Sequence, residues 1–395
     1  MRHSDVVIVG GGIIGSSIAY HLALRAVAVV VVDIGEPAAP PSASWASAGG
    51  VRQQARDPRE WPLTLEASRR WPALERELGA TFDFRQGGHL HVVERDDDVP
   101  ALEARVARER LAGLDVRLVD AAEIRTLAPG ITPEARLGAY SQSDGQANPP
   151  KATRAFAAAA MARGVRYCTG ARPVRLRRTG HVVRTVVVNG EPFGGRWVVL
   201  AAGAWSAGIA GAVGIELPVA PRAPQMLLTD PGPPALAPTI SGTGRRLSLK
   251  QLPTGEFLVG GGWPSVIDGL GTPTMSCRVL PQNVEGSWRV ASTVFPPLTA
   301  RRIVRSWCGL EGEAIDGVPL IGPAVGVEGL YLATGFSGHG FQLSPAVGRA
   351  VADALVGEED DALAPLQPSR LADLDAARLR AFRAETKNRA LGTLG

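Results

Sequence analysis

The chain has 395 residues, of which 45% are hydrophobic and 20% are charged, a size and balance that predict two domains with buried cores and argue against disorder. Its formal net charge of +4 comes from interleaved acidic and basic residues, so a nucleic-acid surface is not indicated. Three cysteines without paired spacing predict neither a disulfide framework nor a metal site, and no apolar run approaches the roughly 20 residues that span a membrane. We therefore expect a cytoplasmic protein without membrane insertion.

The first elements along the chain are typical of a dinucleotide-binding unit. A strand of β-branched residues leads into GGGIIG at residues 10–15, and a helix and a second apolar strand follow before Asp33. Gly10 permits a tight turn, Gly12 lets backbone amides reach a pyrophosphate, and Gly15 lets the helix pack on the strand. Asp33 is placed to accept hydrogen bonds from an adenosine ribose. A glycine turn without a ligand is the alternative, and the flanking strands and the acid argue against it.

The segment from Pro40 to Arg52 is a run of small residues. Such a run lets the backbone approach a flat ligand, and its amides and Ser44 can continue along a diphosphate toward a second ring. A flexible linker is the alternative interpretation, but Trp45 and the absence of acidic residues are unusual for one.

The rest of the chain alternates helical and strand patterns. We expect helices at 61–78, 102–111 and 151–163, strands turning at Gly87-Gly88 within 82–93, a return to the nucleotide domain over 138–147, a strand at 165–168, a hairpin at 173–188, strands at 197–202 and 330–334, and many short strands between 217 and 306.

The order of these elements predicts two domains, each built from separate stretches of the chain. Residues 1–80, 145–215 and 305–375 are predicted to form a Rossmann-type α/β domain with a central parallel sheet. Residues 81–144 and 216–304 are predicted to form a second, α+β domain with a mixed, largely antiparallel sheet, and residues 376–395 a helical tail.

Five ordered stretches carry a resemblance that covers nearly the whole chain. They are VVIVGGGIIGSSIAYHLA (6–23), SASWASAGGVR (42–52), VVLAAGAWS (198–206), WCGL with DGVPLIG (307–310 and 316–322) and SGHGFQLSP (337–345). Together they resemble the D-amino acid oxidase superfamily of FAD-dependent oxidoreductases. Within it the chain is most similar to the glycine oxidase and sarcosine oxidase branch, which includes flavin subunits of dye-linked opine and hydroxyproline dehydrogenases.

The resemblance implies a non-covalent FAD that extends between the two domains. Backbone amides of the loop that contains His339 would face the pyrimidine end of the flavin, because amides at a helix N-terminus stabilise the negative charge of a reduced flavin. His339 would add a cationic or donor contact, or would only cap the helix. The implied FAD-binding residues are Gly10, Gly12, Ile13, Ile14, Gly15, Asp33, Ser44, Ala48, Gly49, Gly50, Val174, Ala202, Gly203, Trp205, Gly338, His339, Gly340 and Phe341.

The implied reaction is oxidation of a C–N bond in an amino acid or an N-substituted glycine. A hydride passes to flavin N5, and the resulting imine hydrolyses in water. The alternative is the FAD subunit of a dye-linked D-hydroxyproline or opine dehydrogenase that passes electrons to a partner. A nicotinamide-dependent dehydrogenase and a non-catalytic flavin-binding subunit are further alternatives, and an oligomer or a partner subunit is compatible with all of them.

The substrate end departs from these relatives. Glycine oxidases place a carboxylate-binding arginine just after Trp-x-Gly-Leu, where this chain has Glu311, which would repel an α-carboxylate if it faced the site. Monomeric sarcosine oxidases keep a lysine after Gly-His-Gly-Phe, where this chain has Gln342. They also use an arginine soon after the small-residue loop. We therefore predict Arg52 as the first carboxylate anchor, with Arg56 and Gln342 next, against the alternative that both arginines lie on the surface.

Two further departures concern the redox chemistry. Leu258 stands where sarcosine oxidases activate oxygen with a lysine, so direct oxidase activity is in doubt. Asn148-Pro149-Pro150 supplies no histidine for the covalent FMN of multi-subunit relatives. Cys308 lies within a residue of a flavin-linking cysteine in monomeric relatives, and we expect it to be a buried free thiol.

Overall fold

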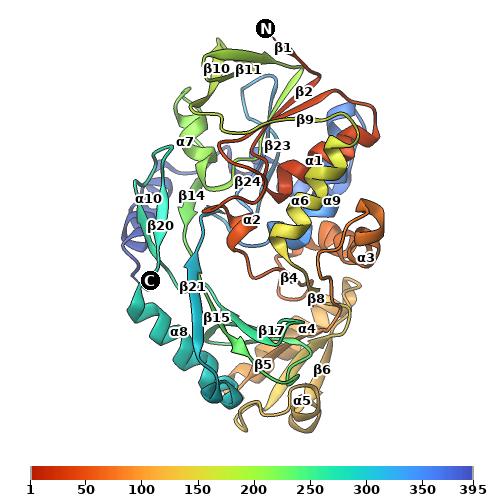
Figure 1. The fold of residues 1–395 in the computed structure, drawn as a ribbon, viewed down its shortest axis with the longest axis vertical. Helices are drawn as coiled ribbons and strands as arrows, with labels where there is room; N and C mark the ends of the chain where they lie inside the picture. The colour runs from red at the N-terminus through yellow and green to blue at the C-terminus, as the bar shows by residue number, and fades with distance from the viewer. Residues whose placement is uncertain (1, 394–395) are drawn as a thin grey trace.

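The computed structural model describes residues 2–393. Figure 1 shows two units arranged along the long axis, one containing the N-terminus and helices α1, α6 and α9, the other built on a broad sheet around β15, β17 and β5. A short ribbon of β4 (Gly50–Val51) and β8 (Gly145–Gln146) lies where the two units meet.

The sheet of the first unit has six strands and is parallel except at one edge. Its central strands β2 (Val6–Val9) and β3 (Val29–Val32) are buried at every residue, as expected for a sheet covered on both faces. The order is β23 (Leu320–Pro323), β24 (Leu330–Thr334), β13 (Trp197–Leu200), β2, β3 and β9 (Arg166–Cys168), and only β23 runs antiparallel to its neighbour.

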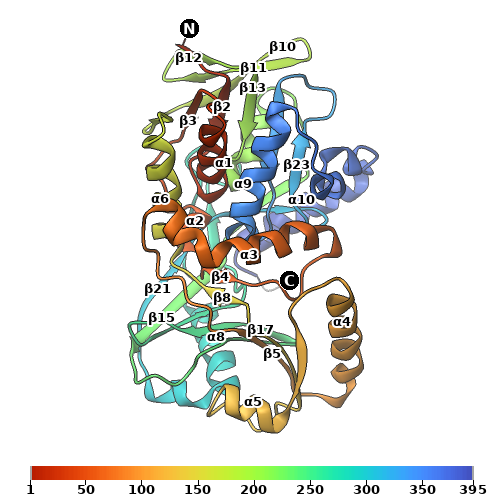
Figure 2. The ribbon, with the colours of Figure 1, turned by 90° about the vertical axis from the view of Figure 1, so that its right-hand side faces the viewer.

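Both faces of this sheet are covered. One face packs against α1 (Ile13–Leu24), which contacts α9 (Gly340–Val356) and α6 (Pro149–Met161), while α9 also contacts α3 (Trp61–Leu78) (Figure 2). The other face packs against a second sheet, in the order β1 (Arg2–His3), β12 (Glu191–Gly194), β11 (Val182–Val188) and β10 (Val174–Thr179). Segments from both ends and the middle of the chain therefore share one core.

The second unit is built on an eight-stranded mixed sheet in which only β16 and β5 pair in parallel. Its order is β21 (Ile303–Cys308), β15 (Gln225–Pro231), β18 (Glu256–Gly260), β17 (Arg245–Gln251), β16 (Thr239–Gly242), β5 (His89–Val93), β7 (Leu137–Ser141) and β6 (Arg117–Asp120). Helix α8 (Pro281–Val294) packs on one face through an apolar core, and the other face is directed toward the first unit. Helices α4 (Val99–Leu111) and α5 (Ala121–Leu127) flank the β6 edge.

The remaining helices and strands are short or lie outside the two large sheets. They are α2 (Ala43–Ala46), α7 (Ser206–Gly211), the pair β14 (Val219–Arg222) and β22 (Glu311–Ala314), the pair β19 (Val266–Asp268) and β20 (Ser276–Arg278), and α10 (Ala376–Ala390).

The predicted α/β fold class with mixed sheets is confirmed, whereas two local predictions are wrong. Residues 82–93 do not form a hairpin, because β5 pairs with β7 and β16 rather than with the segment before it. Residues 138–147 do not simply return to the nucleotide unit, since Leu137–Ser141 is a strand of the eight-stranded sheet and only β8 leads back. The proposed domain boundaries stay predictions.

Candidate active site

The turn between β2 and α1 requires glycine at two positions. Gly10 has φ 109°, and a Cβ there would lie 2.4 Å from the carbonyl oxygen of Ala201 on the neighbouring strand segment. A Cβ on Gly15 would lie 1.9 Å from the carbonyl oxygen of Gly10. The helix therefore begins in direct contact with the turn, and its N-terminal amides lie at the carboxyl ends of the parallel strands, where such sheets bind ligands.

Asp33 lies immediately after β3, beside the glycine turn. Its carboxylate accepts hydrogen bonds from the backbone amides of Gly11 at 2.5 Å and Gly35 at 3.0 Å. Burial raises the pKa of Asp33, and these amides oppose that effect. The Asp33 backbone oxygen also accepts from Ala171 at 3.0 Å, which brings the start of β10 at Val174 toward the same edge.

The small-residue loop contacts the helix N-terminus. Ser44 on α2 accepts a hydrogen bond from the Ile13 amide at 2.9 Å, and a Cβ on Gly12 would lie 3.1 Å from the same Ser44 oxygen. Gly49 has φ 70°, and a Cβ there would lie 2.1 Å from the carbonyl oxygen of Ala147. The loop is thus held close against both α1 and β8, and only small residues permit that approach.

The C-terminal glycine loop is brought to the same place by helix packing. The Ser17 hydroxyl of α1 donates to the carbonyl oxygen of Ser344 in α9 at 2.8 Å, and a Cβ on Gly348 would lie 2.1 Å from that hydroxyl. Gly338, with φ 85°, precedes α9, and the Phe341 ring lies 4.9 Å from that of Trp71. The N-termini of α1 and α9 therefore lie in one unit although 327 residues separate Ser17 from Ser344.

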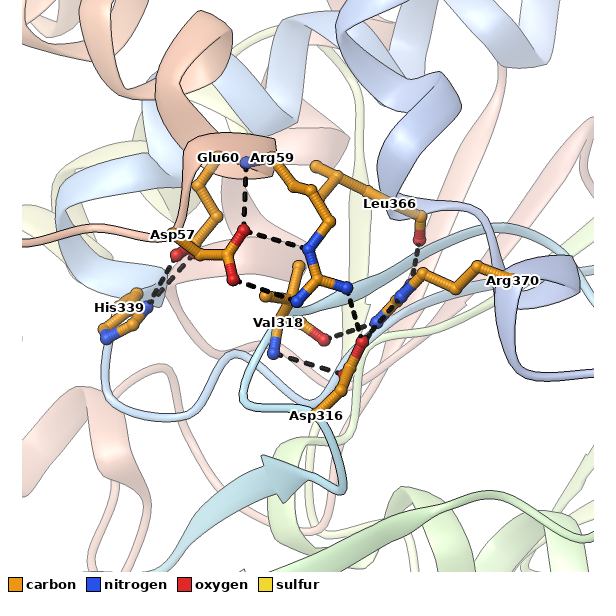
Figure 3. A network of polar contacts seen from close by, with 8 residues as sticks. All are labelled: Asp57, Arg59, Glu60, Asp316, Val318, His339, Leu366 and Arg370. Carbon is orange, nitrogen blue, oxygen red and sulfur yellow. Dashed lines mark hydrogen bonds and ion pairs between the residues drawn. The ribbon is translucent and has the colours of Figure 1, made fainter. Parts of the chain in front are cut away.

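His339 pairs with a carboxylate that the sequence did not reveal (Figure 3). Its Nδ1 lies 3.0 Å from Glu60, whose side chain is fully buried just before α3. Burial lowers the pKa of His339 to about 4, although Glu60 opposes this shift. The imidazole is therefore neutral at pH 7 and donates its Nδ1 proton to Glu60, which leaves Nε2 as an acceptor. His339 makes no side-chain cap of α9, so the capping alternative has no support.

Glu60 is positioned by an ion-pair network. Arg59 donates to Asp57 at 2.9 Å and to Asp316 at 2.8 Å, and Asp316 also accepts from Arg370 at 3.0 Å (Figure 3). Arg370 in turn donates to the carbonyl oxygens of Leu366 and Val318. The turn that carries Glu60 is thereby fixed to two C-terminal segments.

Arg52 and Arg56, the two predicted anchors, are not surface residues. Arg56 is 8% exposed, and burial lowers its pKa to about 9 and lowers the pKa of Arg52 as well. Within residues 2–393 neither guanidinium forms an ion pair, and the one hydrogen bond found is from Arg56 Nε to the Arg52 carbonyl oxygen at 3.3 Å. Charges of Glu60 and Asp144 act on both arginines, which therefore lie near the His339 pair.

Gln342, the third predicted anchor, is bonded to α3, and its role stays a prediction. Its side-chain nitrogen Nε2 donates to the Thr64 carbonyl oxygen at 3.1 Å and to the Ser68 hydroxyl at 3.4 Å on α3, while its side-chain oxygen Oε1 is buried and has no hydrogen-bond partner among the described residues. Glu311 lies beside the glycine loop: a Cβ on Gly338 would be 3.5 Å from its carboxylate, and Arg222 is 3.9 Å away. Burial raises the pKa of Glu311.

The remaining candidates line the same strand ends or lie nearby. Ala202 and Gly203 follow β13 next to Gly10, and a Cβ on Gly10 would lie 3.0 Å from the Ala202 Cα. Cys308 is a buried free thiol, and the neighbouring Cys277 lowers its pKa. In the part of the chain that the structure describes, no cluster of metal-ligating side chains was found, and no helix is long and apolar enough to cross a bilayer.

Comparison with known proteins identifies the family. Residues 5–354 match the DAO family, described as FAD dependent oxidoreductase. The chain belongs to this family. Glycine oxidase of Geobacillus kaustophilus (strain HTA426) is 30% identical over 93% of this chain and 97% of its own length. Sarcosine oxidase subunit beta of Arthrobacter sp is 25% identical over 91% of this chain and 88% of its own length. The structure of L-proline dehydrogenase from P. horikoshii superposes with a TM-score of 0.86, 25% identity and coverage of 94% and 98%.

The protein is therefore an FAD-dependent oxidoreductase, and its residues fit the cofactor of the DAO family. At Gly10, Gly15 and Gly49 the backbone is so close to its neighbours that a side chain would not fit. These glycines lie in the first glycine turn and in the small-residue loop, where the backbone must come close to an extended diphosphate. Asp33 lies beside the first glycine turn. Just before α9, the amides of Ser337 and His339 already donate to the carbonyl oxygens of Gly312 and Phe336. The individual contacts to FAD stay predictions.

Sequence reasoning missed Glu60 and Asp144. An acidic residue just before a helix, like Glu60, is ordinarily a favourable charge at the helix N-terminus, so its spacing carried no signal. Asp144 lies in a short loop before β8, and burial raises its pKa to about 7. Only the tertiary structure shows that both carboxyl groups lie near Arg52.

Proposed function

We propose that this FAD-dependent oxidoreductase oxidises a C–N bond in an amino acid or an N-substituted glycine, whose carboxylate is bound by Arg52 with Arg56 beside it. The observation that supports this proposal is that the buried Arg56 and the partly buried Arg52 form no ion pair with a carboxylate within residues 2–393. A buried charge without a partner is costly, so such a pair favours an anionic ligand. The named relatives, glycine oxidase, sarcosine oxidase subunit beta and L-proline dehydrogenase, agree with an amino-acid substrate.

The position of Glu311 also favours Arg52 as the anchor. Because Glu311 lies beside Gly338, the place where a glycine oxidase would present an arginine carries a carboxylate in this chain. A substrate carboxylate would be repelled there and attracted on the other side of the loop, where Arg52 and Arg56 lie near His339. The substrate would then enter with its carboxylate toward the β4–β8 ribbon.

The bound flavin supplies the hydride acceptor, N5, and the protein supplies orientation. Arg52 would hold the carboxylate in a bidentate contact, which fixes the direction of the carbon that bears the amine. The neutral His339, held by Glu60, would present its Nε2 as an acceptor rather than a cation. Hydrolysis of the imine needs only water.

Reduction of the flavin by amines tests the proposal directly. The purified holoprotein is mixed without oxygen with glycine, sarcosine, longer N-alkyl glycines, D-proline and octopine, and bleaching of the flavin band at about 450 nm identifies the reductant. We expect at least one carboxylated amine to bleach the flavin and its methyl ester to do so poorly. Failure of every member of the panel would contradict the proposed function.

Variants then test the anchor. Loss of a bidentate charge-assisted contact costs about 3 kcal/mol, so Arg52→Met should raise the Kd of the reducing amino acid about 100-fold and remove its advantage over the ester. Arg69→Met, an exposed arginine on α3, is the matched control and should leave both unchanged. Equal effects of the two variants would exclude Arg52 as the anchor.

The second candidate function is a dehydrogenase that passes electrons to a partner. Leu258 is a 6% exposed aliphatic residue where sarcosine oxidases carry their oxygen-activating lysine, and the L-proline dehydrogenase structure is a similar fold over most of the chain. Admitting air to the bleached protein separates the two functions. Recovery within seconds supports an oxidase, whereas slow recovery in air with fast recovery on adding an artificial acceptor dye supports a dehydrogenase.

A further inference from the structure

A row of side chains crosses the eight-stranded sheet at one level. His89 pairs with Thr239, and Lys250 pairs with Leu258. Because Ile240 pairs with Leu249 in antiparallel register, Thr239 stands next to Lys250. Leu228 of β15 pairs with Leu258, and Ser141 of β7 pairs with His89. From one side of the sheet to the other, the row therefore consists of Leu228, Leu258, Lys250, Thr239, His89 and Ser141.

This row occupies the face of the sheet that is directed toward the first unit. The alternate residues, including Leu249 and Ile240, belong to the apolar core under α8, and side chains alternate between the faces of a strand. At the end of β17, Gln146 of β8 donates to the Gln251 carbonyl oxygen at 2.9 Å, so the β4–β8 ribbon lies over Lys250's strand (Figures 1 and 2). The Gly50 end of the small-residue loop therefore lies above this face.

Lys250 is the unusual member of the row. It is 2% exposed, and within residues 2–393 it has neither an ion pair nor a hydrogen bond from its ammonium group. The ionisable side chains on this face are His89 and His91 on β5, Arg246 on β17, Glu256 on β18 and Arg305 on β21, with Arg52 on the segment above. None of them accounts for the state of Lys250, because burial alone lowers its pKa to about 7. Near neutral pH a large fraction of Lys250 is thus an uncharged amine with a free electron pair.

We propose that Lys250 accepts the proton that the ammonium group of the substrate must lose before its C–N bond is oxidised. This inference rests on the proposed function. One N–H bond of the substrate breaks and one N–H bond of Lys250 forms, while the electron pair stays on the substrate nitrogen and becomes available for the C=N bond when the hydride leaves carbon. The flavin is the oxidant, and the total charge of the site does not change in the proton transfer.

Other groups in the row are poorer proton acceptors. Thr239 has no basic atom, and burial lowers the pKa of His89 well below its usual value. The anionic end of the substrate already has two guanidinium groups in Arg52 and Arg56. A third cation is not needed for binding, whereas a neutral amine in a dry site is a suitable base.

Titration of the lysine provides a readout that does not depend on turnover. The chain contains three lysines, Lys151, Lys250 and Lys387, so the NMR spectrum of holoprotein labelled at lysine ¹³Cε has three resolvable signals. We expect one signal to titrate near pH 7 and to disappear in Lys250→Met. If the signal lost in Lys250→Met titrates above pH 9, the inference is wrong.

The pH dependence of anaerobic flavin reduction tests the role itself. In the wild type, the reduction rate constant divided by the substrate Kd should rise with pH to a plateau above about pH 7, where Lys250 is neutral. In Lys250→Met the substrate must arrive as free amine, whose fraction is about 1% at pH 8 for an amine of pKa about 10. The variant should therefore be about 100-fold slower at pH 8 and recover about tenfold for each pH unit up to pH 10.

Controls separate this inference from the others. Lys151→Met, at an exposed lysine paired with Asp83, should keep the wild-type profile. A parallel pH profile in Lys250→Met, or a defect confined to re-oxidation of the reduced flavin, would overturn the role of Lys250 and leave the proposed function intact. If no amine reduces the wild-type flavin, the proposed function itself is overturned, and this inference with it.

Discussion

Adding one methyl group at Gly15, in the variant Gly15→Ala, should weaken FAD binding and lower the stability of the fold. A Cβ there would lie 1.9 Å from the Gly10 carbonyl oxygen, whereas a carbon–oxygen contact is normally about 3.3 Å. Helix α1 would have to move by roughly 1.4 Å relative to β2 to accommodate it. Helix α1 cannot move freely, because the Ser17 hydroxyl is hydrogen-bonded to the Ser344 carbonyl oxygen of α9. This hydroxyl also lies so close to Gly348 that no side chain would fit there.

The expected cost has two parts. Overpacking of this kind destabilises a fold by about 1–3 kcal/mol. The displaced amides would also lose their contact with the FAD diphosphate, and a loss of about 2 kcal/mol corresponds to a roughly 30-fold higher Kd. Gly15→Ala should therefore be purified with little FAD and should unfold at a lower urea concentration than the wild type.

The assay is titration of apoprotein with FAD, followed by quenching of flavin fluorescence, with urea unfolding in parallel. Gly211→Ala is the matched control, because Gly211 ends helix α7 and nothing lies within 4 Å of the position that an added methyl group would take. That variant should bind FAD normally and be neutral or slightly stabilised. Wild-type FAD affinity in Gly15→Ala would refute the argument that this contact sets the position of the helix N-terminus.

Three further predictions concern titration and cofactor attachment. Burial raises the pKa of Asp144 to about 7, so the folded state keeps a proton that the unfolded chain releases near pH 4, and stability falls as pH rises from about 4 to 7. Asp144→Asn should gain up to about 4 kcal/mol over the wild type between pH 4 and pH 8 in urea unfolding, and a constant difference would contradict this. The pKa of His339 is lowered to about 4, so its contribution is present above about pH 6.5 and is lost as pH falls toward 4. In His339→Gln the free energy of unfolding should therefore change with pH between about 4 and 6.5 by up to about 3 kcal/mol less than in the wild type. An unchanged pH dependence over this range would show that the pKa of His339 is not lowered. Because we expect Cys308 to be a free thiol rather than a flavin link, acid precipitation should release FAD from the wild type and from Cys308→Ser alike, and flavin retained in the wild-type pellet would indicate a covalent bond.

Local sequence patterns were sufficient to predict those elements whose contacts are made by residues close together in the chain. The first glycine turn, the helix at Trp61–Leu78, the hairpin around Gly180 and the strand at Leu330–Thr334 have periodicities and turn residues that tertiary contacts do not override. The 82–93 segment failed because Gly87 and Gly88 suggested a turn, whereas the partners of β5 lie far along the chain.

The polar part of the site could not be predicted in the same way. Glu60 and His339 are 279 residues apart, and neither spacing nor residue type links them. Lys250 reads as an ordinary surface lysine in a strand, and only the register of four strands shows that it lies on the inner face. The family resemblance predicted Gln342 as a substrate contact, but its amide nitrogen bonds to α3.

The packing of α1 against α9 has a consequence for the synthesis of the protein. The contact between Ser17 and Ser344 joins residues that leave the ribosome 327 residues apart, which at 5–20 residues per second is an interval of roughly 15–65 seconds. During that interval the sheet that contains β2 and β3, which are apolar along their whole length, lacks strand β24 and helix α9. We therefore expect the nascent chain to carry its cofactor signature long before it can bind a cofactor, and to expose apolar strands that favour aggregation until α9 is made.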